Sequence, residues 1–235
     1  NLQQAIHEHY PDWPEQIELG FRASMPLLEL KLKVNRKEDH VLLEEWKLKI
    51  EHLLAAHIVT QGDRSLAEVV VQLLAQKGLK VSCAESCTGG KIASMITEVS
   101  GSSQVFEAGF VTYANHIKTS VIGVSENVLN EHGAVSEPVV RQMLSGALTV
   151  SGADIGVSVS GIAGPSGGSD EKPVGTVCLA WGTQQKMHSH QFYFPGNRLF
   201  FQKIVSALAL DLIRRELLNI DEAADYFQTH RFHIK

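Results

Sequence analysis

The feature that most constrains the fold is an alternation of short apolar runs with helix-like segments from about residue 63 onward. Runs of strand length that alternate with helical patterns predict helices packed on both faces of a sheet. We therefore expect an α/β fold, a three-layer α/β/α sandwich with a mixed, largely parallel sheet. The expected strands lie at about 79–84, 105–113, 154–160, 174–182 and 187–194, and the expected helices at about 65–77, 91–99, 115–122, 137–150 and 198–218.

The first 60 residues differ, because they are rich in charge and contain a single glycine, Gly20. Apolar and charged side chains alternate toward the end of residues 17–34, which predicts a half-buried strand. Asp39 is placed to cap a helix of about 40–57, and a short strand near 57–60 would follow.

These patterns divide the chain into a small α+β domain at 1–62, a larger domain at 63–220 and a tail at 221–235. The net charge is 21 − 26 = −5, which argues against bulk nucleic-acid binding because that needs a positive field. No apolar run reaches the roughly 18 residues of a membrane span, and no signal peptide is recognisable. Three cysteines do not suggest a disulfide scaffold, so a cytoplasmic protein is expected.

The first segment with chemical potential is ESCTGG at 85–90, where an expected strand leads into a helix. A helix N-terminus carries unpaired N–H groups and partial positive charge, which would ease proton loss from Ser86. Gly89 and Gly90 have no Cβ and would let a ligand approach the backbone. The alternative is that Ser86 or Thr88 only caps the helix. The segment lacks the residues of a P-loop, a G-x-S-x-G elbow or an S-x-x-K motif.

Two further segments carry chemistry. In YANHIK at 113–118, Tyr113 and Lys118 flank a strand-to-helix turn, and a partly buried lysine can act as a general base toward a serine. The alternative is a surface lysine beside a packing tyrosine. The loop SGIAGPSGGS at 160–169 is rich in N–H and hydroxyl groups that suit a phosphate or carboxylate, unless it is only a hairpin connection. The histidine pairs lack cysteine or carboxylate partners at ligand spacing, so no metal site is expected.

Four blocks in this order resemble the C-terminal domain of the CinA competence/damage-inducible family: AESCTGGKIA (84–93), GFVTYANHIK (109–118), SGIAGPSGG (160–168) and KPVGT (172–176). The resemblance implies a nicotinamide-nucleotide amidohydrolase that hydrolyses nicotinamide mononucleotide to nicotinic acid mononucleotide and ammonia. It further implies a serine nucleophile with a tyrosine and a lysine around it, which here are Ser86, Tyr113 and Lys118. No cofactor is expected. Substrate contacts are expected from Thr88, Gly89, Gly90, Asn115, Gly161, Ala163, Gly164, Gly167, Gly168 and Thr176.

The mechanism that this implies begins with attack of Ser86 on the carboxamide carbon to give an acyl-enzyme. Neutral Lys118, directly or through Tyr113, would take the hydroxyl proton and return one to the departing ammonia. Backbone N–H groups at 87–90 would hold the oxyanion, and the glycine-rich loop at 161–168 would hold the phosphate.

Residues 1–60 resemble, more weakly, the KH-like connecting domain of full-length CinA proteins. Those proteins carry, upstream, a molybdopterin-biosynthesis-like domain linked to ADP-ribose pyrophosphatase activity, which is absent from this chain. Residues 1–60 contain no G-x-x-G clamp, and residues 1–80 carry a charge of 10 − 12 = −2, so nucleic acid is not an expected partner. The expected partners are a pyridine nucleotide and a second copy in a homodimer. The alternative function is a non-catalytic nucleotide-binding or oligomerisation domain of a larger CinA protein.

Overall fold

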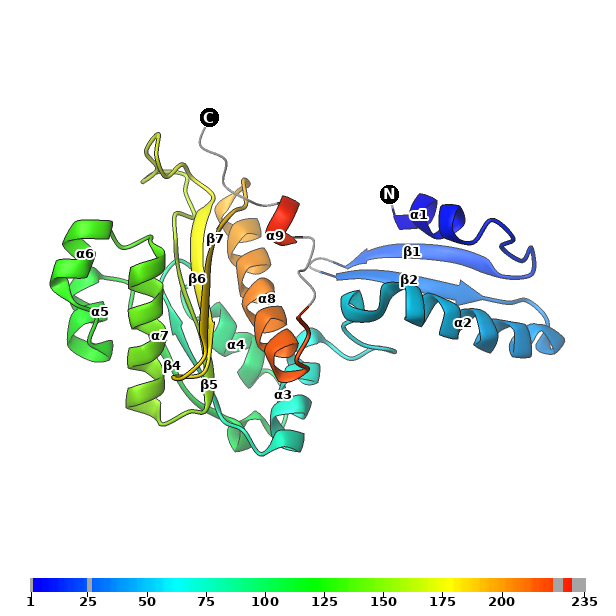
Figure 1. Cartoon of the computed structure of the whole chain (residues 1–235), viewed down its shortest axis with the longest axis horizontal. Coiled ribbons are helices and arrows are strands. Elements are labelled where there is room, and N and C mark those ends of the chain that lie inside the picture. The colour runs from blue at the N-terminus through cyan, green and yellow to red at the C-terminus, as the bar shows by residue number, and fades with distance from the viewer. Residues whose placement is uncertain (1, 25–26, 222–225, 230–235) are drawn as a thin grey trace. The chain divides into compact units, whose positions relative to one another are not determined.

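The computed structural model describes residues 2–24, 27–221 and 226–229 (Figure 1). By its internal contacts the chain divides into two compact units, Asn1–Ile58 and Val59–Lys235. Among the described residues, no helix combines the length and the apolar character needed to cross a membrane.

The first unit is a two-stranded hairpin with helices. Strands β1 (Glu18–Ser24) and β2 (Leu27–Lys33) pair antiparallel, with Glu18 opposite Lys33. Helices α1 (Leu2–His9) and α2 (His40–Leu54) complete the unit. Its core is aromatic, since the ring centroid of Trp46 lies 4.9 Å from that of Trp13 and 5.3 Å from that of Tyr10.

Three expectations for this unit are corrected. The segment expected as one strand folds into the β1–β2 hairpin, and helix α1 was not anticipated. The strand expected near 57–60 does not form; Ala55–His57 is instead a 3₁₀ turn, in which Ala55 has a positive φ of 30°. Asp39 occupies the N-cap position of α2, but its side chain makes no capping hydrogen bond.

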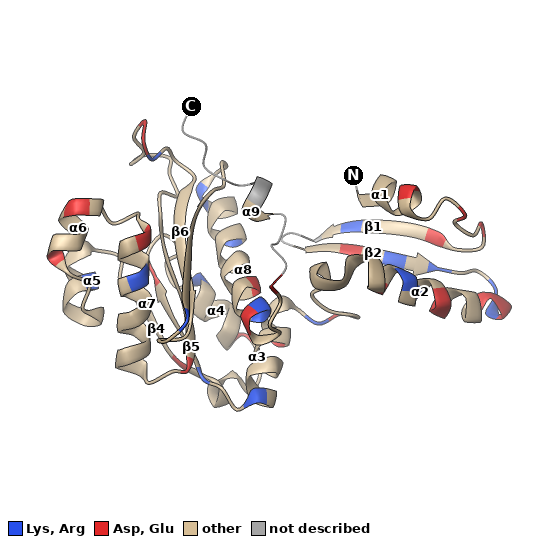
Figure 2. Cartoon of the chain, in the orientation of Figure 1, with Lys and Arg blue, Asp and Glu red and all other residues tan. Residues whose placement is uncertain are grey.

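Charges of both signs lie next to one another on the first unit (Figure 2). Arg22 pairs with Glu29 at 2.9 Å across the hairpin, and Lys49 pairs with Glu45 at 2.7 Å on α2. Residues 1–58 carry seven basic and ten acidic side chains, a charge of 7 − 10 = −3. This distribution gives no excess of positive charge that would attract nucleic-acid phosphates.

The second unit is built on a five-stranded mixed sheet with the order β4-β3-β5-β6-β7. β3 is parallel to both β4 and β5, whereas β6 is antiparallel to β5 and β7. The mixed α/β class is thus confirmed, with two parallel and two antiparallel pairings. The strands are β3 (Val81–Glu85), β4 (Phe106–Val111), β5 (Ile155–Gly161), β6 (Thr176–Gly182) and β7 (Met187–Tyr193).

Helices cover both faces of this sheet, as the three-layer expectation requires (Figure 1). One face packs against α3 (Leu66–Lys77), α4 (Lys91–Thr97) and α8 (Arg198–Leu217). The other packs against α7 (Glu137–Ser151), with α5 (Asn115–Ile122) and an unanticipated short helix α6 (Glu126–His132) beside it.

Local signals explain where α3 begins and ends. Ser65 and Glu68 form a capping box, in which each side chain bonds the other residue's backbone N–H at 3.2 and 2.6 Å. Gly78 ends the helix in the left-handed conformation at φ 64°, which glycine adopts without steric cost.

Part of the expected tail is ordered helix. In α9 (Tyr226–Thr229), the Tyr226 hydroxyl donates to Asp211 of α8 at 2.9 Å, and Phe227 packs 5.3 Å from Phe192 of β7. Residues 222–225 and 230–235 of the tail lie outside the described residues.

The strand register brings the expected site segments to one edge of the sheet. The Ser86 amide donates to Val159 O of β5 at 3.1 Å, and the Thr112 amide donates to Glu85 O at 2.8 Å. Gly161 at the end of β5 pairs with Val177 near the start of β6. The carboxyl ends of three strands therefore meet where ligands bind in open α/β sheets.

Candidate active site

Ser86 and Lys118 are in direct contact at this edge. Ser86 follows the last residue of β3, and Lys118 lies on α5 just after the turn that follows β4. The Lys118 Nζ lies 3.2 Å from the Ser86 Oγ. Ser86 is 9% exposed and Lys118 is 1% exposed, so the pair is largely shielded from water. A serine hydroxyl beside a buried amine is the arrangement of an activated nucleophile and its base.

The surroundings of Lys118 favour a neutral amine. Burial lowers the pKa of Lys118 from its ordinary value, because desolvation penalises the charged form. The Nζ donates to the main-chain oxygens of Thr112 at 2.8 Å and Tyr113 at 3.2 Å. A neutral amine has two N–H donors, which these two carbonyls would occupy. Its lone pair would then be left for the Ser86 hydroxyl proton.

A residue that sequence reasoning missed, Glu85, caps helix α4. Its fully buried carboxylate accepts from the backbone N–H groups of Gly90 at 3.0 Å, Ile92 at 3.1 Å and Ala93 at 2.9 Å. Helix α4 begins only at Lys91, and neither Ser86 nor Thr88 occupies its N-cap position, which is Gly90. The expectation that the positive end of this helix activates Ser86 is therefore wrong, because the carboxylate of Glu85 already neutralises that end.

The amides expected to form an oxyanion hole are only partly available. The Gly89 amide donates to Ser86 O at 3.1 Å, and the Gly90 amide is held by Glu85. Within the described chain, the amides of Cys87 and Thr88 have no carbonyl or carboxylate acceptor. The buried Thr88 Oγ1 has no hydrogen-bond partner in the described structure either. In the loop 86–90, the two amides and the buried Thr88 hydroxyl are therefore the polar groups without such a partner among the described residues.

Gly89 and Gly90 contribute a backbone conformation rather than hydrogen-bond donors for a ligand. Their φ angles are 64° and 94°, in the left-handed region that other residues rarely adopt. A Cβ at Gly90 would also lie 3.4 Å from the Cγ2 of Val111 on the neighbouring strand. The two glycines thus allow the chain to turn sharply between Ser86 and α4.

The side chain and the main chain of Tyr113 contact different residues. Its carbonyl holds Lys118, whereas its hydroxyl accepts from Nη2 of Arg198 at 3.2 Å, and the residue is 60% exposed. Because Lys118 reaches Ser86 directly, no relay through the Tyr113 phenol is needed for proton transfer.

Helix α8 contributes two contacts that sequence reasoning did not find. Asn197 caps α8 by accepting from the Phe200 amide at 3.0 Å, which fixes the first turn. Arg198 Nη1 donates to Gly164 O at 3.1 Å. One turn later, Gln202 Nε2 donates to Cys87 O at 2.8 Å. The only sequence signal was the i, i+4 spacing of these two polar residues, which places them on one face of the first turns of the helix.

The glycine-rich loop is a hairpin connection between the antiparallel strands β5 and β6. Close packing explains why glycine occurs at several positions of this loop. A Cβ at Gly161 would lie 2.9 Å from Val177 Cγ2, and a Cβ at Gly168 would lie 2.7 Å from the Val174 amide nitrogen. Gly164 has a φ of 71°, and its neighbour Ala163 is buried. Gly167 and Gly168 face solvent.

The remaining predicted contacts, Thr176 and Asn115, differ in exposure. The Nζ of Lys172 donates to His132 O at 2.9 Å, which ties the loop to the end of α6. Thr176 is fully buried, and its Oγ1 has no hydrogen-bond partner among the described residues. Thr112, beside Lys118, likewise has a buried hydroxyl without a partner in the described chain. Asn115 is exposed at the start of α5.

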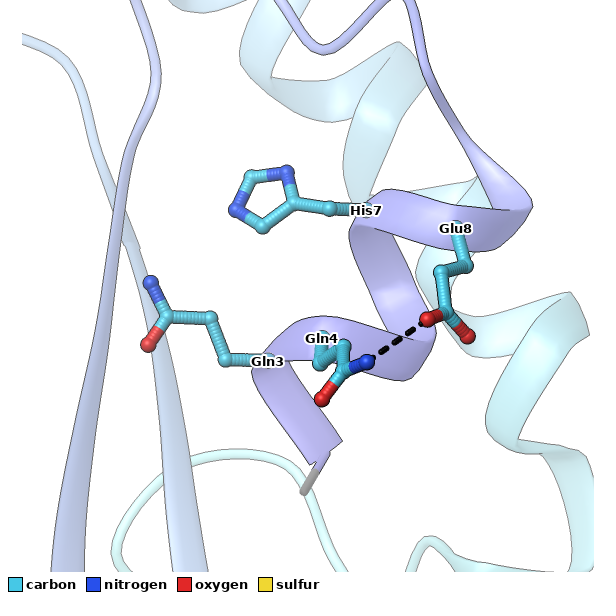
Figure 3. Close-up of a pocket in the computed structure, with 4 residues that line it drawn as sticks. All are labelled: Gln3, Gln4, His7 and Glu8. Atoms are coloured by element: carbon cyan, nitrogen blue, oxygen red, sulfur yellow. Dashed lines mark hydrogen bonds between the residues drawn. The ribbon is translucent and has the colours of Figure 1, made fainter.

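No group of three His, Cys, Asp or Glu side chains in the described ranges is placed to hold a metal ion. All three cysteines are buried and free, and burial raises the pKa of Cys87 and of Cys178 to about 12. An open depression elsewhere, on α1, is lined by Gln3, Gln4, His7 and Glu8 (Figure 3). Gln4 and Glu8 bond each other there at 2.8 Å, and the four lining residues include no serine, cysteine or lysine.

Comparisons with known proteins cover both units. Residues 63–217 match the family model of the CinA C-terminal domain. A CinA-like protein of Colwellia psychrerythraea is 47% identical over 99% of this chain and 54% of its own length. One of Shewanella piezotolerans is 41% identical over 93% of this chain and 52% of its own. The chain thus spans about half the length of these curated relatives. The crystal structure of the competence/damage-inducible protein CihA from Agrobacterium tumefaciens is 40% identical, with a TM-score of 0.62, and covers 66% of this chain and 98% of that one.

Proposed function

Because this chain belongs to the CinA family, we propose that its second unit is an amidohydrolase that converts nicotinamide mononucleotide to nicotinic acid mononucleotide and ammonia. The observation that supports this most is the buried Lys118 Nζ at 3.2 Å from the Ser86 Oγ. A carboxamide is a poor electrophile, so its hydrolysis benefits from a serine whose proton a nearby base can remove.

The first half of the reaction uses the pair directly. Neutral Lys118 accepts the proton of Ser86 as the oxygen attacks the carboxamide carbon. The resulting ammonium then donates a proton to the nitrogen that leaves as ammonia, which gives an acyl-enzyme. In the second half, water takes the place of ammonia, and Lys118 removes a proton from it as it attacks the acyl carbon. The ammonium then returns that proton to the Ser86 Oγ as the ester bond breaks and nicotinic acid mononucleotide is released.

One feature of the site and one of the substrate would lower the barriers of these steps. The amides of Cys87 and Thr88, which have no carbonyl or carboxylate acceptor among the described residues, follow the nucleophile directly and are candidates to bind the oxyanion. The pyridinium ring of the substrate carries a positive charge, which disfavours a protonated lysine nearby and so helps to keep Lys118 neutral.

Release of ammonia from nicotinamide mononucleotide by the purified chain tests the proposal. Ser86→Ala is the decisive variant, because Ser86 caps no helix and its removal should leave the fold intact. We expect ammonia release by the wild type and its loss in the variant. Binding of the nucleotide without any ammonia release would instead indicate a non-catalytic nucleotide-binding domain, and activity retained by Ser86→Ala would refute the serine mechanism.

A further inference from the structure

Arg198 is held at the rim of the site by neutral acceptors. Its Nη1 donates to Gly164 O at 3.1 Å and its Nη2 to the Tyr113 hydroxyl at 3.2 Å. These bonds join the β5–β6 loop to the turn whose main chain holds Lys118. Gln202, one turn further along α8, anchors Cys87 O at 2.8 Å, so the same helix also contacts the nucleophile loop.

The charge of Arg198 has no acidic partner in the described part of the chain. The carboxylate closest to the nucleophile in sequence, Glu85, is fully buried and bonded to three amides. A guanidinium has five N–H donors, and two of those of Arg198 are engaged by described residues. A fixed, partly exposed cation with spare donors is suited to bind an anion.

The glycine-rich loop is a weaker candidate for this task. Its glycines at 161 and 168 are accounted for by close packing against Val177 and Val174. The lysine that follows it, Lys172, is engaged with His132 O. Arg198 nevertheless lies against this loop through Gly164, so an anion on the loop would meet the guanidinium.

We propose that Arg198 binds the phosphate of the substrate and thereby makes the site selective for a nucleotide over the corresponding nucleoside. The proposal rests on the proposed function, which supplies a substrate with a carboxamide at one end and a phosphate at the other. The carboxamide reacts at Ser86 while the phosphate is held by Arg198 at the rim.

The test compares nicotinamide mononucleotide with nicotinamide riboside, which has the same carboxamide and pyridinium but no phosphate. Arg198→Gln removes charge-assisted hydrogen bonds to the phosphate. We therefore expect it to lower kcat/KM for the mononucleotide by about 10–100-fold, mainly through KM. The riboside should change by less than about threefold, because it lacks the group that Arg198 contacts. Lys203→Gln removes the same charge from an exposed position on the same helix and should alter neither substrate.

Equal losses on both substrates would show that Arg198 only supports Tyr113 and the loop. No loss on either substrate would show that Arg198 does not contact the phosphate. Both outcomes leave the ratio of the two kcat/KM values unchanged and would overturn the proposal. Calorimetric binding in the Ser86→Ala background separates this outcome from failure of the proposed function. If the chain releases no ammonia but binds the mononucleotide more tightly than the riboside, and Arg198→Gln abolishes that difference, the anion site stands. If binding shows no such difference, the anion site is refuted.

Discussion

Replacing Glu85 with glutamine should destabilise the second unit although it changes only one atom of the side chain. The buried carboxylate accepts three backbone N–H groups at 2.9–3.1 Å, two on Oε2 and one on Oε1. Glutamine can keep its oxygen toward Gly90 and Ile92, but its NH₂ then faces the Ala93 N–H, donor against donor. One charge-assisted bond is lost, worth about 1.5–3 kcal/mol, together with a charge–dipole contribution of about 0.3–1 kcal/mol. The expected loss in the free energy of unfolding is therefore about 2–4 kcal/mol. A loss near 2 kcal/mol is favoured, because neutral glutamine also removes the cost of burying a charge.

Urea unfolding followed by circular dichroism measures this loss, with Glu68→Gln as the matched control. Glu68 also accepts a backbone N–H at a helix N-terminus, but it is exposed, and glutamine serves equally well in a capping box. The control should therefore unfold at nearly the wild-type urea concentration. If Glu85→Gln does so too, the carboxylate does not hold the start of α4 and the reasoning fails.

The remaining predictions concern the base and its neighbours. Activity should rise with pH through one ionisation below the ordinary lysine value of 10.5, because burial lowers the pKa of Lys118 and only the neutral amine accepts a proton. Lys118→Met should lose that ionisation and roughly 10²–10⁴-fold in rate, whereas His116→Ala should keep the wild-type pH profile; the reverse result would move the base to His116. Between the lowered pKa and 10.5 the Lys118 amine binds more protons in the unfolded chain than in the folded one, so its contribution to stability rises with pH across that window. The buried Cys87 and Cys178, whose pKa is raised to about 12, contribute the opposite trend above pH 9 in both proteins, so the measurement is a difference. Urea midpoints at stepped pH should rise in the wild type relative to Lys118→Met. Tyr113→Phe should lose far less than the roughly 10²–10⁴-fold expected of a proton-transfer group, because phenylalanine retains the carbonyl that holds Lys118; steady-state kinetics showing a loss of that size would restore a phenol relay.

Much of the second unit could be predicted from local sequence signals. The helix at 115–122 has the expected bounds, and the capping box at Ser65 and the left-handed Gly78 mark the two ends of α3 as expected. Strand-to-helix alternation also placed Ser86 and Lys118 at the same sheet edge. These successes share one cause, since each depends on residues within a few positions of one another or on a fold-wide rule of chain topology.

What the sequence did not reveal depends on long-range or unusual partners. Glu85 reads as the last residue of a strand, and nothing local indicates that three amides converge on its carboxylate. Arg198 meets Tyr113 across 85 positions of sequence, and Gln202 meets Cys87 across 115. In the first unit, the alternation near Leu28 was real and corresponds to β2, but residues 17–34 contain no Asn-Gly or Asp-Gly pair that would signal its antiparallel pairing with β1.

The contact between Ser86 and Lys118 joins residues 32 positions apart, whereas the lysine reaches its two carbonyl acceptors within six positions. The turn after β4 can therefore hold the amine by itself, but the serine meets it only once β3 and β4 have paired. In the unfolded chain Ser86 is an ordinary hydroxyl. On the proposed serine mechanism, the reactivity of Ser86 toward an acylating reagent is thus a property of tertiary structure. A refolding chain sampled with such a reagent would then acquire label only once these two parallel strands have come together, so labelling of Ser86 would report assembly of the sheet.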